Sequence, residues 1–126
     1  MAATPTRIVV IDDSPLYRRT ICNMLEKQPN MQIVAEAEDG AYAIQAVKTH
    51  RPDVVLMDIT MPILNGIEAT QIIRSKFPGT RVLVLTMHTD ESFSERAYQV
   101  GACGFLSKGC SKIELFRAIK DCFHKC

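Results

Sequence analysis

The stretch V-V-L-M-D-I-T-M-P, residues 54–62, decides the fold because it places an aspartate directly after four apolar residues. Four apolar residues in a row are typical of a short strand that is buried on both faces, as in a parallel sheet. Asp58 follows without a polar transition, and Pro62 ends the extended run. Burying a carboxylate costs several kcal/mol unless something pairs with it. We therefore predict a paired aspartate at the end of a buried strand, placed there for its chemistry.

Four other segments have the character of strands. R-I-V-V-I-D (7–12) repeats the apolar run followed by an acid, R-V-L-V-L-T (81–86) ends in threonine, and G-F-L-S-K (104–108) ends in lysine. M-Q-I-V-A-E-A-E (31–38) instead alternates, which is typical of an edge strand that is covered on one face. The alternation predicts a single inward face made of Met31, Ile33, Ala35 and Ala37.

Helical patterns separate these strands. Apolar spacing and capping residues predict helices over residues 15–28, 41–50, 67–77 and 92–100, and a last helix after the capping box of Ser111 and Glu114. The expected inward residues are Leu16, Ile21, Met24 and Leu25 in the first helix and Phe116, Ile119 and Phe123 in the last. Five strands alternating with five helices predict an α/β fold, a parallel sheet with helices on both faces.

Composition limits the functions open to this chain. Its 126 residues are enough for one domain, residues 1–126, and 15 basic against 14 acidic residues give a net charge of +1. This balance offers no electrostatic footprint for nucleic acid or for an anionic membrane. No apolar run approaches the roughly 18 residues of a membrane span, so we expect a cytoplasmic protein. The five cysteines, an odd number without framework spacing, are expected to be free thiols: Cys22, Cys103, Cys110, Cys122 and Cys126.

The strand ends carry the residues that matter for chemistry. In an open α/β sheet, sites form at the carboxyl ends of the strands, and here those ends carry Asp12, Asp13, Asp58, Thr86 and Lys108. Two carboxylates about 4 Å apart repel by about 4 kcal/mol at an effective dielectric of 20, so three together need a cation. Mg²⁺ prefers oxygen ligands and keeps water or phosphate in its other positions. The pattern favours attack of the Asp58 carboxylate on a phosphoryl group, which gives an aspartyl-phosphate.

The motifs I-D-D-S-P, L-M-D-I-T-M-P with Asn65-Gly66, V-L-T-M-H and G-F-L-S-K together resemble the receiver domain of two-component response regulators over essentially the whole chain. The resemblance implies a flavodoxin-like (βα)5 doubly wound sheet with strand order 2-1-3-4-5. It implies a signalling switch that catalyses only its own phosphorylation and dephosphorylation. The phosphoryl donor would be a sensor histidine kinase or a histidine phosphotransfer domain.

The resemblance also implies roles for individual residues. Asp58 would be the phosphoacceptor, and Asp13, Asp58 and the Thr60 backbone carbonyl would bind Mg²⁺, with Asp12 reaching the ion through water. Thr86 and Lys108 would contact the phosphoryl group, and Thr86 would act with Phe105 as the switch. Met87 and His88 border the site, where they could tune access and hydrolysis. Gly109 follows the lysine, where many family members have a cis proline, so a looser loop is expected there.

The segment E-R-A-Y-Q-V-G-A-C-G-F-L-S-K after T-M-H most resembles the NarL/FixJ (LuxR-type) subgroup, whose members usually carry a C-terminal helix-turn-helix. The chain is therefore expected to control a DNA-binding transcription regulator as its N-terminal part, without binding nucleic acid or membrane itself. A stand-alone phosphorelay receiver is the alternative. A homodimer formed on phosphorylation is also left open.

Two rival readings use a similar sheet. A haloacid-dehalogenase-type phosphatase also has an aspartate nucleophile and Mg²⁺, but it needs a second acid two residues later, where this chain has Thr60. A flavodoxin-like electron carrier needs a phosphate loop rich in glycine and hydroxyl groups after the first strand, where this chain has D-D-S-P. Both are weaker than the receiver interpretation.

Overall fold

The computed structural model describes residues 4–59, 65–87 and 90–124. Strands and helices alternate along this part of the chain: β1 (Thr6–Ile11), α1 (Pro15–Glu26), β2 (Met31–Ala37), α2 (Gly40–His50), β3 (Val54–Met57), α3 (Gly66–Lys76), β4 (Arg81–Thr86), α4 (Glu91–Gln99), β5 (Gly104–Ser107) and α5 (Lys112–His124). The strands form one parallel sheet in the order β2-β1-β3-β4-β5. The predicted doubly wound fold and strand order are confirmed.

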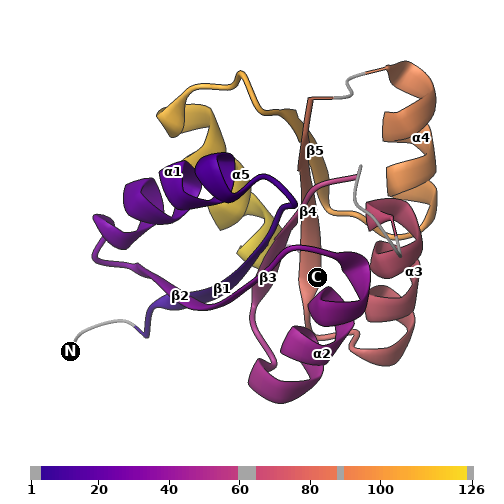
Figure 1. Ribbon diagram of the computed structural model, residues 1–126, viewed down its shortest axis with the longest axis horizontal. Coiled ribbons are helices and arrows are strands. Elements are labelled where there is room, and N and C mark those ends of the chain that lie inside the picture. The colour runs from indigo at the N-terminus through magenta and orange to yellow at the C-terminus, as the bar shows by residue number, and fades with distance from the viewer. Residues whose placement is uncertain (1–3, 60–64, 88–89, 125–126) are drawn as a thin grey trace.

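The helices cover the sheet unequally. As Figure 1 shows, α1 and α5 lie on one face and α2, α3 and α4 on the other. One core cluster joins the first pair to the sheet, with Ile21 and Leu25 from α1 and Leu115 and Ile119 from α5. All four residues of β3 are buried, so this strand lies in the middle of the core, as its apolar run predicts. No helix in the described ranges combines the length and apolar character needed to cross a membrane.

The helix ends follow the capping signals closely. The Ser14 hydroxyl accepts a hydrogen bond from the Tyr17 amide, and Pro15 occupies the first turn of α1. Ser111 and Glu114 each accept from the backbone amide of the other, which confirms the predicted capping box. The prediction for Leu16 was wrong, because its side chain is 78% exposed on the outer side of α1.

The inner face of α5 is shifted from the predicted one. Leu115, Ile119 and Cys122 are its buried residues, while Phe116 and Phe123 are only partly buried at the edge of the cluster. Residues three and four apart share a helix face, so either set satisfies the helical period. Cys122, 1% exposed, is as completely buried as Leu115 and Ile119 and takes a place on the inner face for which Phe116 and Phe123 were predicted.

The edge strand β2 does not present a single inward face. Its pairing with β1 shifts register between Ile8 and Val9: Ile8 lies opposite Ile33, but Val9 lies opposite Ala35. One extra residue in a strand moves the following side chains to the other face of the sheet. Met31 and Ile33 consequently pack with the α1 and α5 cluster, whereas Ala35 and Ala37 pack on the α2 side. The predicted common face of Met31, Ile33, Ala35 and Ala37 was wrong.

The prediction of five free thiols was also wrong. Cys103, just before β5, forms a disulfide with Cys122 of α5, and their Cα atoms lie 5.6 Å apart. Cys22 and Cys110 are free, Cys22 being buried in α1. Cys126 lies outside the described residues. Cys103 and Cys122 are 19 residues apart in sequence. They meet because the chain leaves β5 and returns through α5 to the start of the same strand.

Candidate functional site

Three carboxylates meet at the carboxyl end of the sheet. Asp12 and Asp13 follow β1, and Asp58 follows β3, which pairs directly with β1. One carboxylate oxygen of each lies within 4.8 Å of the others, with Asp12 and Asp58 buried and Asp13 exposed. The predicted clustering of the acidic side chains is therefore present.

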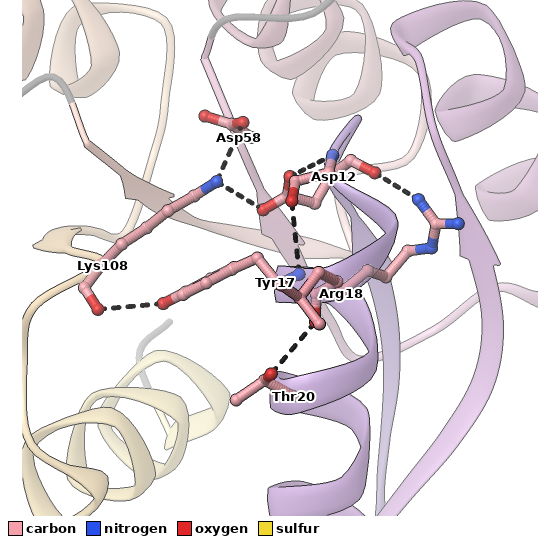
Figure 2. A network of polar contacts seen from close by, with 8 residues as sticks. Asp12, Tyr17, Arg18, Thr20, Asp58 and Lys108 are labelled. Carbon is pink, nitrogen blue, oxygen red and sulfur yellow. Dashed lines mark hydrogen bonds and ion pairs between the residues drawn. The ribbon is translucent and has the colours of Figure 1, made fainter.

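Lys108 closes this cluster from the end of β5. Its Nζ lies 2.7 Å from Asp12 Oδ2 and 3.3 Å from Asp58 Oδ2, and its side chain is only 7% exposed. Figure 2 shows the ammonium between the two carboxylates. A buried carboxylate pair would repel strongly without a cation, and the lysine supplies one. Lys108 therefore compensates part of the negative charge that Asp58 brings into the buried end of the sheet.

Tyr17 of α1 contacts Lys108 through both its hydroxyl and its ring. The Tyr17 hydroxyl donates a hydrogen bond of 3.0 Å to the Lys108 carbonyl, and Lys108 Nζ lies 4.4 Å from the centroid of the Tyr17 ring. The second distance is within the range of a cation–π contact. Arg18 in the next position donates to the Asp12 carbonyl (Figure 2). The first turn of α1 therefore fixes both the lysine and the loop that carries the acids.

Burial and charge pairing act in opposite directions on the pKa of each buried partner, Asp58 and Lys108. Burial raises the pKa of the Asp58 carboxyl, and the nearby Asp12 charge raises it further, against the Lys108 ammonium and a hydrogen bond from Thr86 that lower it. Burial alone would lower the pKa of Lys108, but its bonds and charge interactions with Asp12 and Asp58 raise the pKa above its usual value. Lys108 is therefore held firmly as a cation.

The backbone around Asp58 is fixed by neighbouring segments. The Asp58 amide donates to the Ile11 carbonyl at 3.1 Å, which extends the β1–β3 ladder by one residue. Gly66, at the start of α3, passes so close that a Cβ there would lie 2.0 Å from the Asp58 carbonyl oxygen. Its amide donates to the Ile59 carbonyl at 2.8 Å. Only glycine permits this approach, so Gly66 sets the path of the chain that leaves β3.

Thr86 and Phe105 lie on the opposite side of Asp58 from Asp12. Thr86 ends β4 and is fully buried, while Phe105 in β5 pairs with Val84 of β4. The Phe105 side chain is partly buried against a cluster that includes Val84 and Ala97 of α4. Met87 is 72% exposed at the rim. Thr86, at the end of β4, therefore lies between Asp58 and β5, the strand that carries Phe105.

The cluster is chemically suited to a divalent cation. Its donors are carboxylate oxygens, which Mg²⁺ prefers, and the exposed Asp13 leaves a side open to water. Two predicted members of the site, Thr60 and His88, lie outside the described residues.

The sequence analysis did not predict the roles of two residues that shape the site, Tyr17 and Gly66. Tyr17 is one of three tyrosines, and nothing in its local pattern distinguishes it from a surface residue. The only available signal was its position one turn after the Asp12-Asp13 pair, which places it near the rim. Gly66 appeared only as part of a motif, since its contact with Asp58 depends on how α3 packs.

Comparisons with known proteins agree with this arrangement. Residues 8–120 match the family described as the response regulator receiver domain. The transcriptional regulatory protein DegU of Brevibacillus brevis is 41% identical over 114 residues, which are 90% of this chain and 48% of that protein. The probable transcriptional regulatory protein NarL of Mycobacterium tuberculosis is 39% identical over 116 residues, 92% of this chain and 54% of that protein. The chain thus spans about half the length of these relatives.

A solved structure extends the agreement to three dimensions. The signal receiver domain of the putative response regulator NarL from Mycobacterium tuberculosis superposes with a TM-score of 0.92 at 37% identity, covering 96% of this chain and 98% of that one. The similarity therefore includes the whole sheet and its helices. With its acidic cluster and buried lysine at the carboxyl ends of the strands, the chain belongs to the response regulator receiver domain family.

Proposed function

We propose that Asp58 is the phosphoacceptor of this receiver domain. The supporting observation is the position of its carboxylate at the end of β3, with Lys108 Nζ 3.3 Å away and two acidic neighbours beside it. Phosphoryl transfer needs little covalent help from the protein, so catalysis rests on positioning and on compensation of charge. Asp58 is the member of the cluster placed between the lysine, the other acids and Thr86, so it is the acid best placed to carry a new phosphoryl group.

The other residues divide the work around it. Asp13, Asp58 and the Thr60 backbone carbonyl would hold Mg²⁺, and Asp12 would reach it through water. The ion would neutralise charge on the phosphoryl oxygens when bound. Lys108 would move its ammonium from the carboxylates to a phosphoryl oxygen, and the Thr86 hydroxyl would donate to another. The lysine thus neutralises charge in both states.

The phosphoryl donor in this proposal is a phosphohistidine of a sensor kinase or a phosphotransfer domain. The relatives, which are named as transcriptional regulators and are about twice as long, support a proposal about domain boundaries and output. We propose that residues 1–126 are the receiver part of such a regulator, with a DNA-binding helix-turn-helix in the rest of the chain and dimerisation after phosphorylation. A cytoplasmic location belongs to the same proposal.

A phosphorylation assay tests the assignment. Incubation with acetyl phosphate and Mg²⁺ should add one phosphoryl group per chain, measured by intact mass, and chelation of Mg²⁺ should prevent the gain. Asp58→Asn should remove the gain, whereas Asp121→Asn, an exposed position on α5, should leave it unchanged. Stoichiometric phosphorylation of the Asp58→Asn variant would overturn the proposal.

A further inference from the structure

The Cys103–Cys122 disulfide lies far from the acidic cluster in the fold. Cys103 immediately precedes β5 at the amino end of that strand, whereas Asp58 and Lys108 lie at the carboxyl ends of theirs. The bond joins the β5 entrance to the last turns of α5. Cys122 is 1% exposed, but Cys103 is only partly buried, so the two cysteines differ in exposure to solvent.

A pocket lies beside the more accessible cysteine. It has a volume of about 290 Å³ and is lined by Arg74, Arg81, Tyr98, Gly101 and Cys103, among others; we call it the basic pocket. Its lining, within the described ranges, contains two arginines and no carboxylate. The volume is near the lower end of the roughly 300–1,000 Å³ of small-molecule sites, which suits a small ligand rather than a protein loop.

Arg74 of the basic pocket is built into the fold. Arg74 Nη1 donates to the carbonyls of Pro78 and Thr80 at the turn before β4. The Arg74 side chain also packs under Gly101, whose positive φ of 103° turns the chain toward Cys103. A guanidinium has five N–H donors, so these bonds engage only part of the group. The positive charge is therefore fixed beside the disulfide and does not depend on a freely moving surface side chain.

We propose that Cys103 and Cys122 form a reversible redox site that exchanges with a small anionic thiol bound in the basic pocket. The thiolate attacks the Cys103 sulfur, a new S–S bond forms between ligand and Cys103, and the bond to Cys122 breaks, with Cys122 taking up a proton. A second thiol then attacks the ligand sulfur of the mixed disulfide, which releases an oxidised ligand dimer and a Cys103 thiol. Two ligand thiols are oxidised as one protein disulfide is reduced. Positive charge near the reacting sulfur favours an anionic nucleophile.

The exchange would change how α5 is held. In the oxidised state a covalent bond holds α5 against β5, two residues before Phe105. In the reduced state only packing holds it, with Cys122 in the cluster of Leu115 and Ile119. Disulfides in reducing compartments are usually transient or redox-sensing, which fits such a reversible role.

The kinetic test uses the oxidised wild-type protein with two small thiols of opposite charge. Reduced glutathione is anionic and cysteamine is cationic. The rate at which each thiol reduces the disulfide is followed by acid quench, alkylation and mass spectrometry, and is corrected for the fraction of thiol present as thiolate. The ratio of the glutathione rate to the cysteamine rate, measured on the urea-unfolded protein, is the reference. We expect folded protein to favour glutathione by at least about fivefold over that reference, because two arginine charges line the pocket beside Cys103 and act at short range. Arg81→Gln should clearly reduce this preference, and Arg96→Gln, an exposed arginine of α4, should keep it.

A trapping test identifies the attacked sulfur. Cys122→Ser incubated with oxidised glutathione should accumulate a mixed disulfide at Cys103, located by peptide mapping, whereas Cys103→Ser should gain little at the buried Cys122. A rate ratio in the folded protein equal to that of the unfolded reference, an unchanged preference in Arg81→Gln, or reduction only by a protein dithiol would each overturn the proposal. None of these readouts involves Asp58, so failure here and failure of the phosphoacceptor assignment are distinguishable.

Discussion

Tyr17 holds Lys108 at two points: its hydroxyl donates to the Lys108 carbonyl at 3.0 Å, and its ring lies 4.4 Å from Nζ of the same lysine. The lysine is the cation that makes two buried carboxylates tolerable in the absence of metal. One aromatic residue of α1 therefore positions the charge on which the whole site depends, although it offers no ligand itself. The consequence can be tested through stability and its pH dependence.

Tyr17→Phe should keep the ring contact and lose the hydrogen bond, lowering the free energy of unfolding by about 1 kcal/mol. Burial, followed by the charges of Cys110, Asp12 and Asp58, raises the pKa of Tyr17 from 10.0 to about 12. The unfolded chain then loses this proton first, so wild-type stability should fall as pH rises from 10.0 to about 12. Urea unfolding across this window should show a smaller fall for Tyr17→Phe, while Tyr98→Phe should behave as wild type. An identical fall in both variants would contradict this role of Tyr17.

Lys108→Met should leave Asp12 and Asp58 as a buried pair without their cation. Breaking a buried charge pair from one side costs about 3–5 kcal/mol, so the melting temperature without divalent metal should drop clearly. Adding Mg²⁺ should recover much more stability in the variant than in wild type, because the ion replaces the missing charge. The control is Lys120→Met on the exposed side of α5. If the variant is as stable as wild type without Mg²⁺, the compensating role of Lys108 is wrong.

Gly66→Ala should be severely destabilising because the added Cβ would lie 2.0 Å from the Asp58 carbonyl oxygen. Relieving such an overlap requires backbone shifts, for which about 3 kcal/mol is a reasonable scale. Gly79→Ala is the matched control, since nothing lies within 4 Å of a Cβ at that position. Chemical denaturation of both variants measures the difference. Similar stabilities would show that the path from β3 to α3 adapts easily.

Thr86→Ala should still accept a phosphoryl group on Asp58 but should lose the response at Phe105 and α4. A hydrogen bond from the Thr86 hydroxyl to a charged phosphoryl oxygen is worth about 1.5–3 kcal/mol, enough to shift a two-state equilibrium by roughly ten- to a hundredfold. NMR shift maps with and without the mimic beryllium trifluoride measure the response, and Thr86→Ser, which keeps the hydroxyl, should retain it. Phe105 signals that move as far in Thr86→Ala as in wild type would exclude Thr86 as the coupling residue.

The strand ends were predictable because they depend on local pattern. An apolar run followed by a polar residue identified Asp12, Asp58, Thr86 and Lys108, and parallel topology requires such ends to meet at one edge. The β2 register was not predictable, because nothing in the local alternation marks where the pairing with β1 takes in the extra residue at Val34. The disulfide escaped for a similar reason. Cysteine spacing alone cannot show that the last turn of α5 returns to the start of β5.

The central claim is that the Asp58 carboxylate carries the phosphoryl group, and chemical trapping tests it most directly. Protein treated with acetyl phosphate and Mg²⁺ is reduced with borohydride, which converts an aspartyl-phosphate to homoserine, and the product is located by peptide sequencing in a mass spectrometer. We expect homoserine at position 58, and none when Mg²⁺ is chelated before phosphorylation. Homoserine at position 12 or 13 instead, or a phosphoryl group stable to borohydride on a serine or threonine, would contradict it.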